Sequence, residues 1–156
     1  MVKVLRRLTL EEVENQITEL EMTHGVSFDE YEEKLLTAQN VEEKVFDTYF
    51  RWGRLVHAYR GYVEGGELHC VVEEQLDFSS EDLRALTPRR LELLYGLSDL
   101  RVESINDLAH KVRRDVKNVY NDLKVLKNLG LVRLVRKRDG KIVPEAVVEE
   151  VTFAFQ

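Results

Sequence analysis

Lysine, arginine and asparagine side chains recur between residues 113 and 141, and all of them can hydrogen-bond polar or anionic groups. Asparagine can make paired hydrogen bonds to the edge of an adenine, whereas lysine and arginine bind phosphate. The candidates that fall on or just before one stretch of helical periodicity are Arg113, Arg114, Lys117, Asn118, Tyr120, Asn121 and Lys124. An ordinary solvated helix face would carry similar residues, so the surrounding elements must decide between the two interpretations.

Capping residues define the helix that carries these side chains. Asp115 precedes it as a candidate N-cap, and Gly130 follows its last apolar residue, where a left-handed residue is common. A shorter helix is predicted before it, beginning after Ser104, whose side chain can cap the backbone three residues on. The stripe of the longer helix that should face a core consists of Val116, Val119, Leu123 and Leu126. The two helices therefore have the order of a helix-turn-helix.

A basic hairpin is predicted after Gly130. Residues 131–135 alternate as in a strand, Asp139-Gly140 is a favourable turn, and residues 141–143 return. The cations at its tip, which would bind phosphate or enter the minor groove, are Arg136, Lys137, Arg138 and Lys141. A basic hairpin directly after a helix-turn-helix makes a winged helix, and this combination favours a DNA interface over a solvated face.

Basic residues are concentrated in one part of an acidic chain. The 156 residues carry a net charge of −6. Residues 1–86 hold 9 Lys and Arg against 19 Asp and Glu, a net charge of −10, and residues 145–156 add 3 acidic residues and no basic ones. Residues 87–144 hold 14 basic and 7 acidic residues, a net charge of +7. The local charge therefore agrees with a nucleic-acid partner, although the average does not.

The segment 87–155 resembles the winged helix-turn-helix of archaeal MarR-like transcriptional regulators. Three stretches carry the resemblance: Leu-Thr-Pro-Arg-Arg-Leu-Glu-Leu-Leu at 86–94, a helix opening with Arg-Asp-Val-Lys-Asn-Val at 114–126, and Gly-Leu-Val at 130–132. The resemblance implies a recognition helix in the major groove of double-stranded DNA, and it identifies no operator. We expect Asp122, close to the DNA face, to be solvated or paired within the chain.

Residues 1–66 are predicted to form an acidic region of three helices, which begin after Thr9, after Ser27 and at Asn40. The third helix has an apolar seam of period 3.5, made by Val45, Tyr49, Trp52, Val56, Tyr59 and Val63. Such a seam is typical of paired helices, so we predict a homodimer or partner interface there; packing within the chain is the alternative. Gly53 and Gly61 permit close approach of another helix or mark a break.

Residues 67–86 are interpreted as a connector, with a strand over 68–76 and a short helix ending near Leu86. Residues 87–156 form the DNA-binding domain, opened by a helix at Thr87-Pro88. We expect Leu91, Leu94 and Tyr95 to make the buried face of that helix, and Arg89 and Arg90 to be solvated. Residues 147–155 should form a strand that extends the hairpin or pairs with another copy of the chain.

Several classes of protein are disfavoured by what the sequence lacks. The four histidines lack the spacing of metal ligands, and no glycine-rich phosphate loop occurs, so we expect no enzyme activity, cofactor or metal. Cys70 is the single cysteine, which rules out an internal disulfide and favours a packed side chain. No apolar run approaches 18 residues and no signal peptide is evident, so a cytoplasmic protein is expected.

The sequence thus predicts a mainly α protein with a small β component, an α+β arrangement of N-terminal helices and a C-terminal winged helix. The predicted function is a sequence-specific, double-stranded DNA-binding transcriptional regulator, acting as a dimeric repressor. Two alternatives remain open. One is an antitoxin-type autoregulator whose acidic helical arm binds a toxin, and the other is a winged-helix protein-interaction module.

Overall fold

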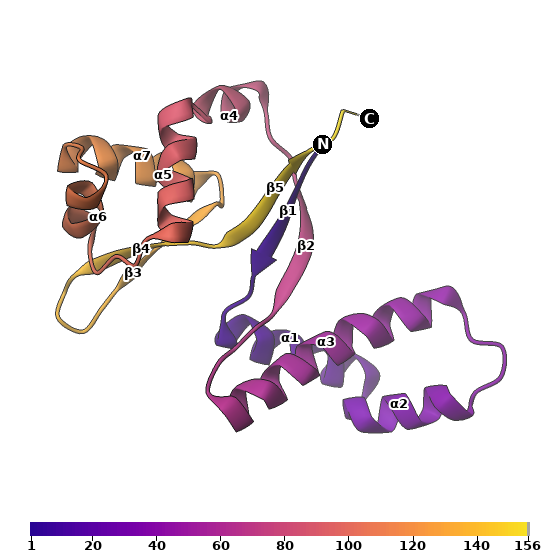
Figure 1. The fold of residues 1–156 in the computed structure, drawn as a ribbon. Helices are drawn as coiled ribbons and strands as arrows, with labels where there is room; N and C mark the ends of the chain where they lie inside the picture. The colour runs from indigo at the N-terminus through magenta and orange to yellow at the C-terminus, as the bar shows by residue number, and fades with distance from the viewer. Residues whose placement is uncertain (156) are drawn as a thin grey trace. The chain divides into compact units, whose positions relative to one another are not determined.

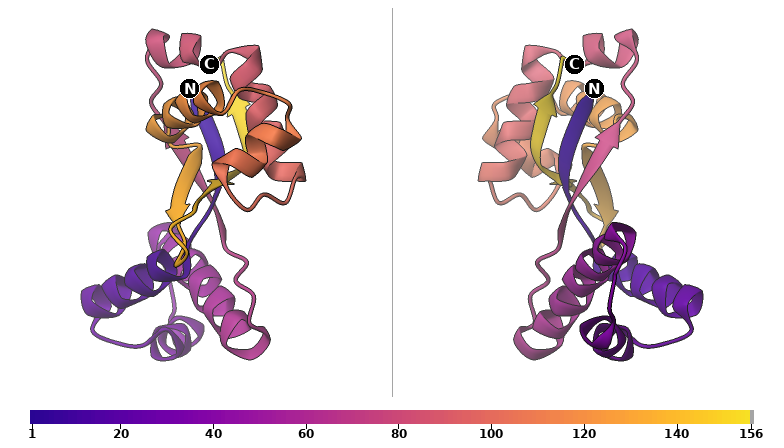
Figure 2. Two further views of the ribbon diagram at one scale, coloured as in Figure 1. Left: turned by 90° about the vertical axis from the view of Figure 1, so that its left-hand side faces the viewer. Right: turned by 90° about the vertical axis from the view of Figure 1, so that its right-hand side faces the viewer.

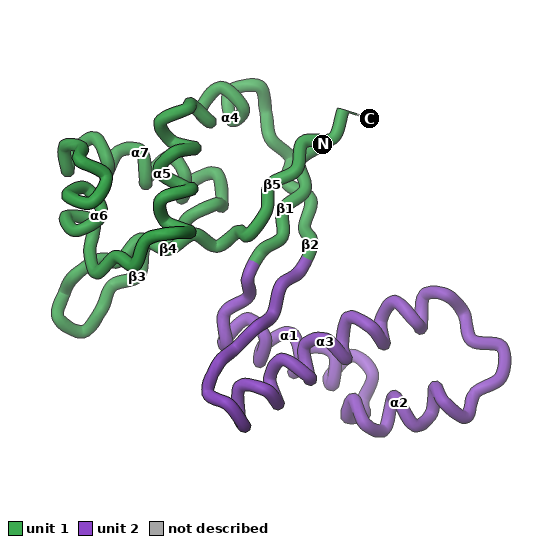
Figure 3. The backbone as a smooth tube through the Cα atoms, in the orientation of Figure 1, with its two compact units in different colours: residues 1–6, 73–156 green, residues 7–72 purple. Residues whose placement is uncertain are grey.

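The computed structural model describes residues 1–155 and contains seven helices and five strands in two small sheets over that part of the chain (Figure 1). The predicted mainly α class with a small β component is confirmed. The chain forms two compact units (Figure 3). Unit 1 comprises residues 1–6 and 73–156, and unit 2 comprises residues 7–72.

Unit 2 consists of three helices: α1 (Leu10–His24), α2 (Phe28–Thr37) and α3 (Glu43–Gly65). Thr9 and Glu12 form a full capping box before α1, and the Ser27 hydroxyl accepts the Glu30 N–H before α2, as predicted. The third helix begins at Glu43 rather than Asn40, because Asn40 has a left-handed φ of 60° that a helix cannot include.

The core of unit 2 is aromatic and centres on Trp52, which is fully buried and packs against Phe28 and Tyr31. Gly53 explains how Phe28 of α2 comes so close to α3. A Cβ at Gly53 would lie 3.2 Å from Cζ of Phe28, so the predicted role of this glycine in close helix approach is confirmed. Gly61 has no neighbouring atom within 4 Å and plays no such part.

A three-stranded sheet is made by β1 (Val2–Arg7), β2 (Val71–Leu76) and β5 (Val148–Phe153), in the order β2-β1-β5. Apart from Arg7, Val71 and Val72, its residues belong to unit 1. β1 and β5 pair antiparallel, with Val2 opposite Phe153 and Val4 opposite Val151. No strand was predicted before Thr9. The predicted extension of the hairpin by the last strand is wrong, because β5 pairs with the N-terminal strand of its own chain (Figure 2). Pairing with another copy of the chain stays a prediction.

The remaining elements of unit 1 are α4 (Ser80–Ala85), α5 (Pro88–Asp99), α6 (Ile105–Lys111), α7 (Val116–Asn128) and the hairpin of β3 (Val132–Arg136) with β4 (Ile142–Ala146). They enclose a core that includes Leu93, Leu108 and Leu123. The predicted buried face of α5 was wrong for two residues, since Leu91 and Tyr95 are 37% and 75% exposed. Leu93 and Leu97 are buried instead, because α5 packs on α7 and β4 through that side.

The two units divide the chain differently from the predicted domains 1–66, 67–86 and 87–156. Residues 1–6 belong to the same unit as α5, α6, α7 and the hairpin of β3 and β4, and so does most of the predicted connector. Residues 67–72 belong to the helical unit. The difference arises because the sheet of unit 1 takes its middle strand from the opposite end of the chain, a pairing that local sequence patterns do not reveal.

Candidate nucleic-acid interface

The helix-turn-helix of α6 and α7 is defined by hydrogen-bonded caps. The Asp107 N–H donates to the Ser104 hydroxyl at 3.0 Å, and the Asp107 carboxylate accepts the Glu103 N–H at 2.9 Å. This backbone hydrogen bond, helped by Lys111, lowers the pKa of Asp107 from its ordinary value. At α7 the Asp115 carboxylate accepts the Asn118 N–H at 3.2 Å. Both predicted caps are therefore confirmed, and they fix where each helix starts.

The turn between the helices depends on Arg113, which has a left-handed φ of 55°. A non-glycine residue in this region costs about 1 kcal/mol. Within the turn, the Arg114 N–H donates to the carbonyl of Ala109 at 2.9 Å. The Arg113 side chain is exposed, so the turn presents a cation to solvent beside the first residues of α7.

The inner side of α7 is a continuous apolar stripe. Val119, Leu123 and Leu126 are fully buried, which confirms three of the four residues predicted to face the core. Val116 is 43% exposed and does not belong to the stripe, because it lies in the first turn of the helix, where no neighbouring element covers it. Burial of this stripe determines which side of α7 faces outward.

The outer side of α7 carries the predicted polar residues. Lys117, Asn118, Asn121 and Lys124 are exposed, and Tyr120 is 40% exposed. The Lys124 ammonium lies 5.1 Å from the centroid of the Tyr120 ring, a distance at which cation and ring attract each other. The structure thus brings together on one helix face two amides, two cations and one aromatic ring.

Asp122 pairs with two arginines in unit 1. Its carboxylate lies 3.0 Å from Nε of Arg90 and 2.5 Å from Nη2 of Arg114, and the three side chains are only 15%, 24% and 18% exposed. Arg90 also donates to the carbonyl of Ala85 at 2.9 Å. Asp122 is therefore an intramolecular partner, one of the two roles expected for it. Arg90 was wrongly predicted to be solvated.

The same cluster changes the expected role of Arg114. Its guanidinium pairs with Asp122, which also pairs with Arg90, so one negative charge is shared by two cations and the cluster keeps a net charge of +1. This pairing organises the start of α7, and a phosphate contact by Arg114 stays a prediction. An open depression of about 320 Å³ lies over this cluster and is also lined by Thr87, Arg89, Asn118 and Asn121. Arg89 is exposed there, beside the two amides, and becomes a candidate contact that sequence reasoning assigned to solvent. The helix start at Thr87-Pro88 was the sequence signal that could have identified Arg89 as a candidate contact.

The hairpin of β3 and β4 forms as predicted. Arg136 lies opposite Ile142, and the Lys137 N–H donates to the carbonyl of Lys141 at 2.8 Å. Asp139 accepts the Lys141 N–H at 2.9 Å, and Gly140 has a left-handed φ of 83°. The tip residues Arg136, Lys137, Arg138 and Lys141 are all exposed. A turn closed by its own hydrogen bonds therefore presents four cations together.

The predicted interface along α3 is largely used inside unit 2. Trp52 and Val56 are buried in its core, and Tyr49 and Tyr59 pack partly against that core. The Tyr49 hydroxyl donates to Glu32 at 2.6 Å, and this hydrogen bond raises the pKa of Tyr49. Val45 is half-buried and Val63 is 64% exposed. Trp52 and Val56, at the centre of the seam, therefore pack within the chain, which was the alternative. Use of the remaining seam residues as a homodimer or partner interface stays a prediction.

Cys70 is 3% exposed and lies directly before β2, so the expectation of a packed side chain is confirmed. Burial raises the pKa of its thiol. Over the described residues, no group of three or more His, Cys, Asp or Glu side chains is placed to hold a metal ion. No helix in that part of the chain is long and apolar enough to cross a membrane.

These features define unit 1 as a unit of four helices with a helix-turn-helix and a β-hairpin, an arrangement compatible with a winged helix. Residues 85–153 match the model of a family described as HVO_A0114, a match that covers less than half of the chain. The matched segment spans α5, α6, α7 and the hairpin and continues to the end of β5. No curated protein matches the sequence.

Proposed function

We propose that this chain is a sequence-specific, double-stranded DNA-binding transcriptional regulator of the MarR-like winged-helix type, acting as a dimeric repressor by occupying its site. The observation that carries the proposal is the outward side of α7. Its apolar stripe is fully buried, and Lys117, Asn118 and Asn121 project from the opposite side at the start of the helix. The N-terminal residues of a recognition helix are those that reach base edges in a major groove.

Each group of residues has a distinct role in this proposal. Asn118 and Asn121 read base edges, with Tyr120 packing beside them, and Lys117 and Lys124 bind phosphate. Arg113 and Arg89 flank the helix start and bind the sugar–phosphate backbone. The tip of the hairpin of β3 and β4, which would be the wing, adds four exposed cations. These suit phosphate contact or insertion into a minor groove. Arg114 acts indirectly, since its pairing with Asp122 holds the start of α7 in place.

Base reading and phosphate binding can be separated by two substitutions. Once a bound site has been selected from genomic fragments, Asn118→Ala should cost about 1–3 kcal/mol on that site and little on random duplex. Arg138→Ala should weaken binding to both duplexes and lower the salt slope by about one phosphate contact. Fluorescence anisotropy at several salt concentrations measures both quantities.

Arg51→Ala, which removes an exposed cation of α3 in unit 2, is the matched control and should change neither affinity. If Asn118→Ala lost the same affinity for specific and for random duplex, base reading by the amide would be contradicted. Absence of any salt-sensitive binding to duplex DNA at low ionic strength would contradict the function as a whole, and would leave a winged-helix protein-interaction module as the better description.

A second candidate function is favoured by the charge of unit 2. Residues 7–72 hold 6 basic and 14 acidic residues, a net charge of −8, and Phe46 and Phe50 of α3 are 42% and 62% exposed. An acidic surface with exposed aromatic rings suits a basic protein partner, as in an antitoxin that regulates its own synthesis. Copurification of a small basic protein from the native source, lost in Phe50→Glu, would support this function.

A further inference from the structure

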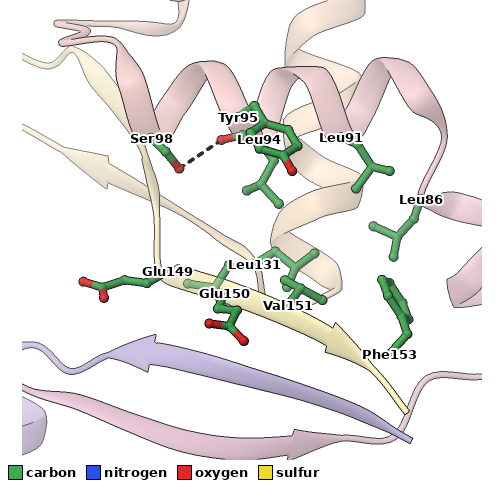
Figure 4. A pocket seen from close by; sticks show the side chains of 11 residues that line it. Leu86, Leu91, Leu94, Tyr95, Ser98, Leu131, Glu149, Glu150, Val151 and Phe153 are labelled. Carbon is green, nitrogen blue, oxygen red and sulfur yellow. Dashed lines mark hydrogen bonds between the residues drawn. The ribbon is translucent and has the colours of Figure 1, made fainter. Parts of the chain in front are cut away.

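Two depressions on unit 1 differ in character. One is a groove of about 350 Å³ between α5 and β5, with a mostly apolar lining. Figure 4 shows Leu91 and Tyr95 on the α5 side of this groove, facing Val151 and Phe153 on the β5 side. The other depression, of about 320 Å³, lies over the start of α5 and the first half of α7 and is lined by polar and charged side chains. This second depression borders the side of α7 that we propose to contact DNA.

One acidic residue, Asp122, stands among the cations of the second depression. It is the single carboxylate among the described residues of the lining, whose other charged or amide side chains are Arg89, Arg90, Arg114, Asn118 and Asn121. A carboxylate repels phosphate, and binding to random duplex depends on phosphate contacts. The charge of Asp122 therefore opposes nonspecific binding at the place where the neighbouring arginines favour it.

Asp122 connects three segments of unit 1. Its carboxylate accepts hydrogen bonds from Arg90 of α5 at 3.0 Å and from Arg114 of the turn before α7 at 2.5 Å. Arg90 is held a second time, because it also donates to the carbonyl of Ala85. Within the described part of the chain, the Arg114 guanidinium pairs with Asp122 alone. Loss of the carboxylate would thus release Arg114 and leave Arg90 in place.

The position of Asp122 along α7 couples this cluster to the two amides. Asn118 and Asp122 are four residues apart, so they share one face of the helix, and Asn121 directly precedes Asp122. A guanidinium pairs with a carboxylate in a restricted planar geometry. Pairing with Arg90 of α5 therefore limits the rotation of α7 about its axis and holds the amides in one orientation before a duplex is bound. Such preorganisation favours the complex that uses that orientation.

We propose that Asp122 is a specificity-determining residue of the DNA interface. It holds Arg114 away from the phosphates of random duplex, and it keeps Asn118 and Asn121 in the orientation that the specific site requires. The first effect lowers the nonspecific affinity and the second preserves the specific affinity, so both raise the ratio of the two. This inference rests on the proposed DNA-binding function.

The experiment compares the full chain with Asp122→Asn by fluorescence anisotropy, on a selected genomic site and on random duplex, at several salt concentrations. The variant should bind random duplex about tenfold more tightly at low salt, with a salt slope steeper by about one phosphate contact, because Arg114 is released. Affinity for the selected site should not rise with it, because the amides lose their fixed orientation. A purely structural role for Asp122 would instead weaken binding to both duplexes without a steeper slope.

A double variant and a control identify the source of the change. Asp122→Asn with Arg114→Gln removes one charge of each sign. It should return the affinity and salt slope on random duplex to those of the parent, and should bind the selected site more weakly than the parent does. Asp99→Asn, at the exposed far end of α5, is the charge-matched control and should change neither the affinity ratio nor the slope. Circular dichroism checks folding, and Asp122→Ser, which removes the same charge, replaces Asp122→Asn if that variant does not fold.

The outcomes separate this inference from the proposed function. Equal changes in affinity on both duplexes, or a slope on random duplex no steeper than that of the parent, would overturn the inference and leave the proposed function standing. A steeper slope that persisted in the double variant would also overturn it, since the added contact would not come from Arg114. A parent protein that bound no duplex at low salt would overturn the proposed function, and the inference with it.

Discussion

Arg113 combines an unfavourable backbone conformation with an exposed charge, so the two properties can be tested separately. Its φ of 55° lies in the left-handed region, where glycine pays no steric cost. Arg113→Gly should leave the free energy of unfolding unchanged or raise it by up to about 1 kcal/mol, because the strain is relieved. The same change should weaken DNA binding, since the guanidinium is lost. Urea denaturation and anisotropy on random duplex measure the two effects.

Arg113→Ala is the matched variant, because it removes the same charge and keeps the strained backbone. Both variants should lose DNA affinity by the same factor, while any gain in the free energy of unfolding should be confined to the glycine variant. If the glycine variant bound duplex as tightly as the parent, Arg113 would be a turn residue without a DNA contact.

Single residues also show how far sequence reasoning reached at the candidate interface. The exposed amides of α7 and the cations of the wing were predictable, because helical periodicity and turn chemistry are local properties. The pairing of Arg114 with Asp122, an aspartate that Arg90 shares, was not, since Asp122 lies eight residues away and Arg90 lies on another helix. Which cations are free to bind phosphate depends on tertiary pairing, and a list of basic residues overstates their number.

At the scale of elements, the cap of α6 makes its stability dependent on pH. The Asp107 carboxylate accepts the Glu103 N–H and pairs with Lys111 at 3.1 Å, which lowers its pKa in the folded state. A lowered pKa stabilises the fold above the ordinary pKa of aspartate, and this contribution is lost as the pH falls through the folded value. Asp107→Asn should therefore lower the urea midpoint at neutral pH, and the gap to the parent should close in acid.

Urea titrations of both proteins over a series of pH values measure that gap. Ser98→Ala, on the exposed side of α5, serves as the control and should shift the midpoint equally at every pH. A gap for Asp107→Asn that did not change with pH would attribute the effect to packing or to helix propensity, and not to the carboxylate charge.

Elements differed in how well local patterns predicted them. Five helix starts were predictable, because each depends on a hydrogen bond between residues three apart. These starts follow Thr9, Ser27, Thr87, Ser104 and Asp115. The orientation of α5 was not, because apolar residues occur on more than one of its sides. Tertiary contacts with α7 and β4 select Leu93 and Leu97 for the core, and Leu91 and Tyr95 are left to line the groove.

For the whole molecule, the main feature that the sequence did not reveal is the use of residues 1–6 in unit 1. Val2 and Val4 are 5% and 2% exposed and belong to the same core as Leu123 of α7. β1 lies between β2 and β5, so it supplies hydrogen bonds to both. Strand pairing between opposite ends of a chain leaves no local signature, whereas helical periodicity does.

This arrangement predicts that the C-terminal part of the chain is not self-sufficient without β1. A fragment of residues 71–156 keeps the whole of β2 but lacks β1, and should be less stable than the full chain by at least about 3 kcal/mol, the value of burying two valines. A peptide of residues 1–8 should restore the loss in trans, and the same peptide with Val2→Asp and Val4→Asp should not. Thermal unfolding with each peptide measures the rescue. Equal stability of fragment and full chain would show that β1 is dispensable, and that the core of unit 1 closes without the N-terminal strand.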